Sequence, residues 1–185
     1  RMSERLVSAL LPWYQTHRAE AVNESLVSGG YLNDDFVRVL FLPVWGTSTP
    51  LVDLLMDEVG AMMGWWTGME LQHASTYGAR VYQRGAVLLN HVDVMNTHLA
   101  SAVLQVHQVV DQDEGWPLEI LTASGDCYEV YLQPGEMVLY EGARFKHGRP
   151  MMFRGEEFAN VFSHFHPVTW NGVRHENFPD VKAEL

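Results

Sequence analysis

Cysteine is almost absent from this chain, which has one, Cys127, among 185 residues. A single thiol excludes an intrachain disulfide and a zinc site built from several cysteines. It fits a reducing compartment without excluding an oxidising one. No secretory signal is visible, so a cytoplasmic location is slightly favoured, although the start at Arg1 leaves room for an upstream targeting segment.

Basic residues and long apolar runs are also scarce. The 12 Lys and Arg stand against 23 Asp and Glu, which gives a formal net charge of −11. An acidic surface repels phosphate backbones, so we expect no nucleic-acid partner. No apolar run reaches the roughly 18 residues of a membrane span, so we expect no membrane partner. The hydrophobic fraction of 47% instead predicts one folded domain, residues 1–185, of undetermined oligomeric state.

Residues 1–76 have the apolar spacing of helices and are interpreted as a helical support. Ser3 can cap a first helix, which Pro12 is expected to interrupt or restart. A rough apolar stripe then continues through Val22 to the pair Gly29-Gly30, which is the expected stop.

A second helix has a clearer start. Thr49 can cap it, and Pro50 suits the first helical position. Leu51, Leu55, Val59 and Met62 recur on one face, and Gly64 is the expected stop.

From residue 77 the pattern changes to short strands separated by turn residues. The expected strands are 77–89 (broken at Gly85), 98–110, 118–122, 128–132, 137–140, 145–149 and 158–166. Many short strands predict a sandwich or barrel. Residues 77–168 are therefore the expected core, and residues 169–185 the expected tail.

His91 and Asp93 form the first chemical signal. On an extended strand, residues two apart project from the same face, so both side chains can reach one ion. His147 comes after the expected strand that ends at Tyr140. Two histidines and one carboxylate on one face of a metal leave the opposite positions open, as in non-haem iron(II) oxygenases. A His-x-Asp triplet alone is a weak signal, because short motifs arise by chance.

The surrounding motifs make the signal specific. They are Tyr82-Gln83-Arg84-Gly85 before His91-Val92-Asp93, the turn Pro134-Gly135-Glu136 leading into a strand that ends at Tyr140, His147 with Pro150 and Gly155, and Phe162-Ser163-His164. In this order they resemble the prolyl 4-hydroxylase branch of the iron(II) and 2-oxoglutarate dependent dioxygenases. The likeness covers residues 77–168.

This resemblance implies a mainly β fold with flanking N-terminal helices around a double-stranded β-helix, a jelly-roll or cupin-like core. It implies iron(II) held by His91, Asp93 and His147, with 2-oxoglutarate as cosubstrate, dioxygen as oxidant and ascorbate as an optional reductant. Decarboxylation of 2-oxoglutarate to succinate would accompany hydroxylation of a prolyl or other residue. The implied substrate is a peptide, a protein or an amino acid.

The sequence departs from the family pattern where a cation should bind the far carboxylate of 2-oxoglutarate. Glu156 and Glu157 occupy the positions at which the family usually has Lys or Arg. Arg154 is the first replacement candidate, ahead of Arg149, and Arg80 is the third. A guanidinium group grips a carboxylate with two hydrogen bonds, so each suits the chemistry.

The expected substrate side consists of Tyr82, His98, Phe162 and His164. His98 falls where prolyl hydroxylases have an arginine, and Phe162 falls where they have a tryptophan. Because these two residues differ, the resemblance does not imply that the substrate is a peptidyl proline. The alternative function is a non-catalytic or 2-oxoglutarate-independent cupin-like protein that binds a metal or ligand. The displaced cation favours this alternative, and the intact His91, Asp93 and His147 favour the enzyme.

Overall fold

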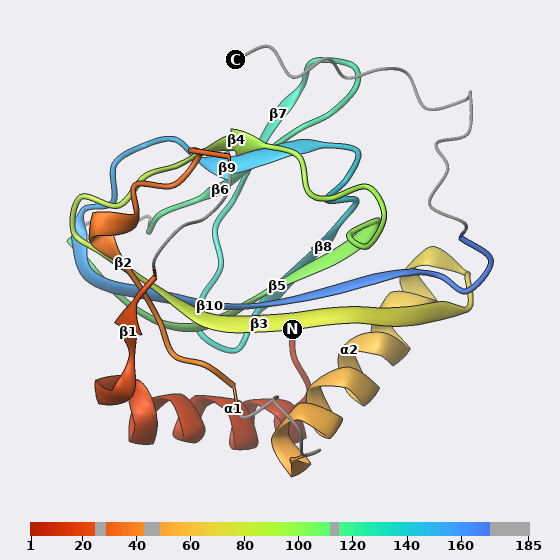
Figure 1. Cartoon of the computed structure of the whole chain (residues 1–185), viewed down its shortest axis with the longest axis horizontal. Helices are drawn as coiled ribbons and strands as arrows, with labels where there is room; N and C mark the ends of the chain where they lie inside the picture. Colours follow the sequence, from red (N-terminus) through yellow and green to blue (C-terminus); the bar gives the residue numbers. More distant parts are fainter. Residues whose placement is uncertain (25–28, 43–48, 112–114, 171–185) are drawn as a thin grey trace.

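The computed structural model describes residues 1–24, 29–42, 49–111 and 115–170, and within them two antiparallel sheets face each other. The strands are β1 (Val22–Asn23), β2 (Val37–Val39), β3 (Leu71–Gln83), β4 (Leu88–His91), β5 (Ala100–Val110), β6 (Leu118–Leu121), β7 (Cys127–Val130), β8 (Met137–Tyr140), β9 (Lys146–Arg149) and β10 (Gly155–Pro167). The larger sheet has the order β1-β2-β3-β10-β5-β8, and the smaller has the order β4-β9-β6-β7. Two helices, α1 (Glu4–His17) and α2 (Pro50–Thr67), lie on the outer side of the larger sheet (Figure 1).

Helix α1 begins as expected, because the Ser3 side chain accepts a hydrogen bond from the amide of Leu6. The expected interruption at Pro12 is wrong. Pro12 lies inside the helix on its exposed side, where solvent can satisfy the carbonyl group that its missing N–H leaves free. The helix ends at His17, and Val22 pairs with Val39 in a strand, because strand pairing outweighs a weak helical stripe.

Helix α2 begins at Pro50 with Thr49 as its cap, as the sequence predicts. The expected stop at Gly64 is wrong. The helix continues to Thr67 and ends at Gly68, whose φ of 68° lies in the left-handed region that glycine adopts without strain.

The strands follow the expected pattern with shifted ends. Strand β3 begins at Leu71, ahead of the expected residue 77, and Gly85 lies in the turn between β3 and β4. Of the expected tail, residues 169–170 are described and residues 171–185 lie outside the described residues. No helix within the described ranges is long and apolar enough to cross a membrane.

Strand β5 shows how the larger sheet acquires two different faces. Its even-numbered residues from 100 to 106 belong to the buried cluster that contains the apolar side chains of α1 and α2. Val103 instead packs with Leu118 of the smaller sheet and Phe162, and Ser101 and Gln105 are buried on the same side. Because the helices take up the apolar face, the polar face is free to line the space between the sheets.

The packing of α2 on the larger sheet gives a test of this arrangement. Leu55 is fully buried, so Leu55→Ala should lower the free energy of unfolding by about 2–5 kcal/mol through lost burial and a new cavity. Leu89→Ala is the matched control, because that side chain is 50% exposed and its loss should cost well under half as much. Urea unfolding of both variants measures the difference. Equal losses would show that α2 does not contribute the buried core described above.

Candidate metal centre and active-site cavity

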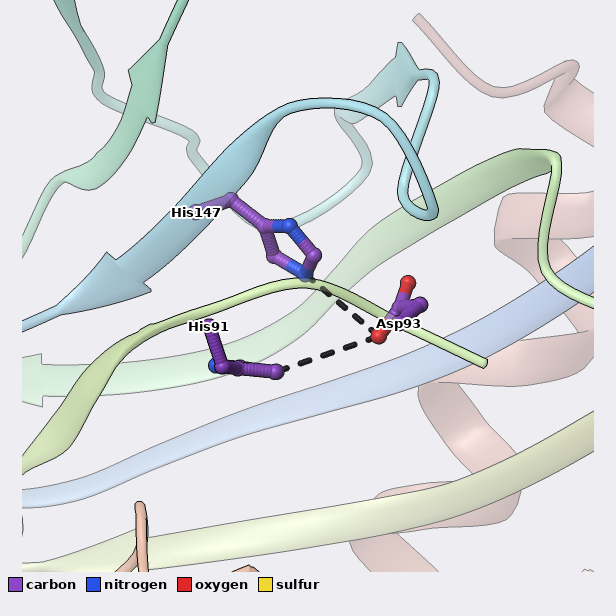
Figure 2. A group of neighbouring side chains, drawn as sticks. All are labelled: His91, Asp93 and His147. Carbon is purple, nitrogen blue, oxygen red and sulfur yellow. Dashed lines mark ion pairs between the residues drawn. The ribbon is translucent and has the colours of Figure 1, made fainter. Parts of the chain in front are cut away.

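His91, Asp93 and His147 converge on one point between the sheets, as Figure 2 shows. Antiparallel pairing of β4 with β9 sets His91 opposite His147. Their Nε2 atoms lie 3.8 and 3.6 Å from Oδ1 of Asp93. The three ligand atoms all lie within 4.8 Å of one another, so one ion can contact them all.

Backbone carbonyl groups orient both imidazoles. The Nδ1 atom of His91 lies 2.8 Å from the carbonyl oxygen of Leu89, and that of His147 lies 3.0 Å from the carbonyl oxygen of Phe145. A carbonyl oxygen only accepts, so Nδ1 must carry the proton and donate it. Each Nε2 therefore keeps its lone pair, which is the arrangement that metal-binding histidines use.

The carboxylate of Asp93 is held by two neighbours. Its Oδ2 accepts a hydrogen bond from the Ser101 hydroxyl group at 3.2 Å, and its backbone N–H donates to the carbonyl of Gly142 at 2.9 Å. A Cβ atom on Gly142 would lie 2.1 Å from Asp93 Oδ2 and 2.4 Å from Ser101 Oγ. Gly142 is therefore required for this carboxylate position, although no sequence signal indicated it.

The protonation states also suit a divalent cation. Burial, followed by the neighbouring His147, lowers the pKa of His91 to about 4. Burial alone would raise the pKa of Asp93, but its interactions with His147, His164 and His98 hold that pKa below its ordinary value. At neutral pH the site therefore presents a neutral His91 imidazole and an ionised carboxylate, which are the forms that bind metal.

The three residues lie at the wall of a cavity of about 370 Å³. The apolar part of its lining includes Leu88, Val103, Leu118 and Phe162. Its polar part includes two arginines, Arg80, which is partly buried, and Arg149, which is fully buried. The site thus combines a metal-binding cluster, apolar walls and fixed positive charge, as ligand cavities commonly do.

No protein-family model matches this sequence, and no curated protein matches it. Solved structures do match. A prolyl-4-hydroxylase of Pseudomonas putida aligns over 90% of this chain and 88% of its own, with a TM-score of 0.60 and 18% identity. A prolyl hydroxylase of Trichoplax adhaerens, solved with a hypoxia inducible factor peptide fragment, has a TM-score of 0.66 at 11% identity over 89% of this chain and 80% of its own. HygX of Streptomyces hygroscopicus, solved with nickel and 2-oxoglutarate, has a TM-score of 0.63 at 12% identity over 94% of this chain and 86% of its own.

The chain has the double-stranded β-helix fold of the 2-oxoglutarate and iron(II) oxygenases. The mainly β fold class and the structural resemblance expected from the sequence are thereby confirmed. In this double-stranded β-helix, β4 and β9 of the smaller sheet carry His91 and His147, and the segment after β4 carries Asp93.

The three cation candidates lie in different surroundings. Arg154, placed first from the sequence, is exposed and does not line the cavity, whereas Arg149 lines it. Arg80 lines the cavity but is paired with Glu24, whose carboxylate lies 2.8 Å from Nε and 2.6 Å from Nη2. Glu157 lies outside the cavity, where it accepts a hydrogen bond from the Tyr14 hydroxyl group.

Arg149 has the surroundings of a ligand-binding cation. Its side chain is 1% exposed, and Nε donates to the carbonyl of Trp116 at 3.3 Å. Its guanidinium carbon lies 5.2 Å from the Trp116 ring centre and 5.0 Å from that of Phe158. Nη1 is buried without a hydrogen-bond partner among the described residues. A buried, unpaired N–H of a charged group is costly unless a ligand accepts its hydrogen bond.

Three of the four expected substrate-side residues line the cavity. They are His98, Phe162 and His164. The rings of His98 and His164 lie 3.7 Å apart, and His164 Nδ1 lies 2.9 Å from Ser101 Oγ. Tyr82 is fully buried beneath the lining, and its hydroxyl group has no well-formed hydrogen bond among the described residues.

Tyr31 is a cavity residue that sequence reasoning missed. Its ring stacks on the His91 imidazole, with ring centres 4.0 Å apart and planes inclined by 9°. The Tyr31 carbonyl accepts a hydrogen bond from the amide of Leu89, which holds this segment against β4. Only the tertiary fold brings the two rings together, because Tyr31 lies in a segment read from sequence as the stop of a helix.

The crowding at Gly142 leads to a prediction about metal affinity. Gly142→Ala should weaken binding of Mn(II), used as a redox-stable probe, by about 10–100-fold, the usual effect of disturbing a group that orients a ligand. Gly64→Ala is the control, because a Cβ atom there would meet only the Met69 carbonyl oxygen at 3.6 Å, an ordinary contact. Isothermal titration calorimetry measures both affinities. Unchanged affinity in Gly142→Ala would mean that Asp93 does not contact the metal in the position described.

Proposed function

We propose that this protein is an iron(II) and 2-oxoglutarate dependent hydroxylase acting on an uncharged group of a peptide, protein or amino acid. One observation carries the proposal. His91, Asp93 and His147 present their ligand atoms to the same cavity in which Arg149 has a buried, unpaired N–H group. A metal site with open positions and a buried cation for a dicarboxylate are the two parts that this chemistry needs.

The residues present suit both groups. His91, Asp93 and His147 would hold iron(II), which supplies dioxygen activation when bound. Arg149 would bind the far carboxylate of 2-oxoglutarate through its unpaired Nη1. Leu88, Val103 and Leu118 would pack on the aliphatic part of the cosubstrate and exclude water.

The charges around the cavity favour an uncharged reacting group. Arg80 is neutralised by Glu24, and Arg149 is opposite in charge to Asp93. The charges of iron(II) and of the 2-oxoglutarate dianion would cancel each other. Burial keeps the pKa of His164 near 3 and lowers that of His98, so both are neutral at pH 7. A charged group entering this space would lose its hydration without gaining a partner.

Phe162, His98 and His164 would form the substrate side. The Phe162 ring can pack on an apolar side chain, and the two imidazoles can hydrogen-bond a carbonyl group. The prolyl hydroxylase of Trichoplax adhaerens binds a peptide fragment, which supports a peptide as the substrate here. The alternative of a metal-binding protein without catalysis was favoured by the displaced cation, and Arg149 offers a buried cation in the cavity in its place.

The proposal is tested by succinate formation from 2-oxoglutarate. We expect succinate production that depends on iron(II). Asp93→Ala should reduce its rate about 100-fold or more, because loss of a metal ligand should cost more than loss of a group that only orients a ligand. Asp57→Ala is the control, because Asp57 is exposed on α2 and far from the cavity lining. Metal binding without any succinate from the wild-type protein would favour the non-catalytic alternative.

The assignment of Arg149 gives a separate prediction. Arg149→Met should weaken 2-oxoglutarate binding about 30-fold or more, because a buried charge-assisted pair contributes about 2 kcal/mol or more. Without cosubstrate, the same variant should be at least as stable as the wild type to urea, because the substitution removes a buried unpaired charge.

Arg154→Met is the matched control for this test, because that side chain is exposed. It should leave both cosubstrate affinity and stability unchanged. Calorimetric titration of the Mn(II)-loaded proteins with 2-oxoglutarate measures the affinities. Weaker binding in Arg154→Met but not in Arg149→Met would restore the order inferred from the sequence.

A further inference from the structure

Strand β3 has one side that is only partly covered. Strand β10 pairs with it from Leu71 to Gln83. On the other side, β2 pairs with residues 80–82, and the amides of Leu40 and Leu42 continue this ladder to the carbonyls of Ala79 and Gly78. Among the described residues, no segment pairs with residues 71–77 on that side. Their backbone N–H and C=O groups there form an open sheet edge.

A groove of about 290 Å³ runs beside this edge. It is lined by residues 73–78 together with Phe41 and Leu42. Phe41 is 54% exposed, and its ring meets the Tyr77 ring edge-on with centres 6.4 Å apart. The groove therefore combines a strand edge that no described segment pairs with and an exposed aromatic side chain.

The groove adjoins the metal cavity. Ser75, Thr76 and Tyr77 line both of them. On the neighbouring strand β10, Phe162 pairs with Tyr77 and His164 pairs with Ser75. The open edge thus borders the cavity beside the two β10 residues proposed to contact the substrate.

We propose that an extended peptide segment of the substrate binds this edge as an added strand alongside residues 71–77. This proposal rests on the hydroxylase function proposed above and states how the substrate binds. An added strand lies about 4.8 Å from its neighbour, and its alternate side chains project to the same face as Ser75 and Tyr77. One of those side chains would enter the cavity, while the others would remain in the groove.

The occupant follows from the shape and the chemistry of the site. A strand edge offers repeating donors and acceptors, which a peptide backbone can satisfy and a small molecule cannot. A second copy of this chain could also pair with the edge, but it would cover Ser75, Thr76 and Tyr77, which line the cavity as well as the groove. The formal net charge of −11 favours peptides with basic flanking residues through long-range attraction.

The first test uses a degenerate nonapeptide library with the iron(II)-loaded protein and 2-oxoglutarate. Hydroxylated peptides are identified by mass and sequenced, and the best is resynthesised. Phe41→Asp should raise the KM for this peptide about tenfold, as loss of an aromatic contact commonly does. Peptide-free decarboxylation of 2-oxoglutarate should not change, because Phe41 does not line the cavity. Tyr128→Asp is the control, since it changes an aromatic residue that is 58% exposed on β7 of the other sheet.

The second test examines the backbone directly. In an antiparallel pair, a strand directs alternate N–H groups toward its partner. Methylation of single backbone nitrogens along the peptide should therefore weaken binding at alternate positions. Hydrogen exchange of residues 71–77 should slow when the peptide binds, and exchange in β7 should not.

The outcomes separate the two proposals. Absence of iron-dependent succinate formation would contradict the proposed function itself. Two results would overturn edge binding and leave the proposed function standing. One is succinate formation without hydroxylation of any peptide. The other is peptide hydroxylation that is unaffected both by Phe41→Asp and by methylation of the peptide backbone. Peptide-independent protection of residues 71–77 that rises with protein concentration would also overturn it, because the edge would then pair copies of this chain.

Discussion

The antiparallel pairing of β4 with β9 is the interaction on which the candidate site depends. It sets His91 opposite His147, and short hydrogen bonds to the carbonyls of Leu89 and Phe145 fix the orientation of both rings. Asp93 then has only to follow β4 by two residues to complete the cluster. The metal site is thus a consequence of strand register, which a shift by one residue would destroy.

The metal ligands on and after these strands can lie in the protein interior because the larger sheet, which faces them, has two chemically different faces. Its outer face is apolar and is covered by α1 and α2. Its inner face carries polar side chains, among them Ser101, Asn160 and His164. Ser101 holds Asp93 and contacts His164, so one hydroxyl group joins the metal cluster to the expected substrate side. The buried hydroxyl group of Ser101 is tolerated here because it has both of these hydrogen-bond partners.

The two arginines of the cavity differ in their partners. Glu24 neutralises Arg80 and also accepts a hydrogen bond from Tyr77, so this pair resembles a structural support of the wall. Arg149 is surrounded by aromatic rings and keeps an unpaired N–H group. The buried, unpaired N–H group of this charged side chain is costly in the protein alone, and groups of this kind are common at functional sites, where a ligand supplies the missing partner.

The sequence by itself indicated the start of α2 and the succession of strands along the chain, which depend on local spacing. It indicated His91, Asp93 and His147 through the parity of the His-x-Asp triplet together with the resemblance of the surrounding motifs. Tertiary structure alone decided that Pro12 lies within α1, that Arg149 rather than Arg154 reaches the cavity, and that Tyr31 stacks on His91. Each depends on which face of an element is covered or on a contact between distant segments. Solvent exposure, burial and distance are properties of the packed chain, and no short stretch of sequence contains them.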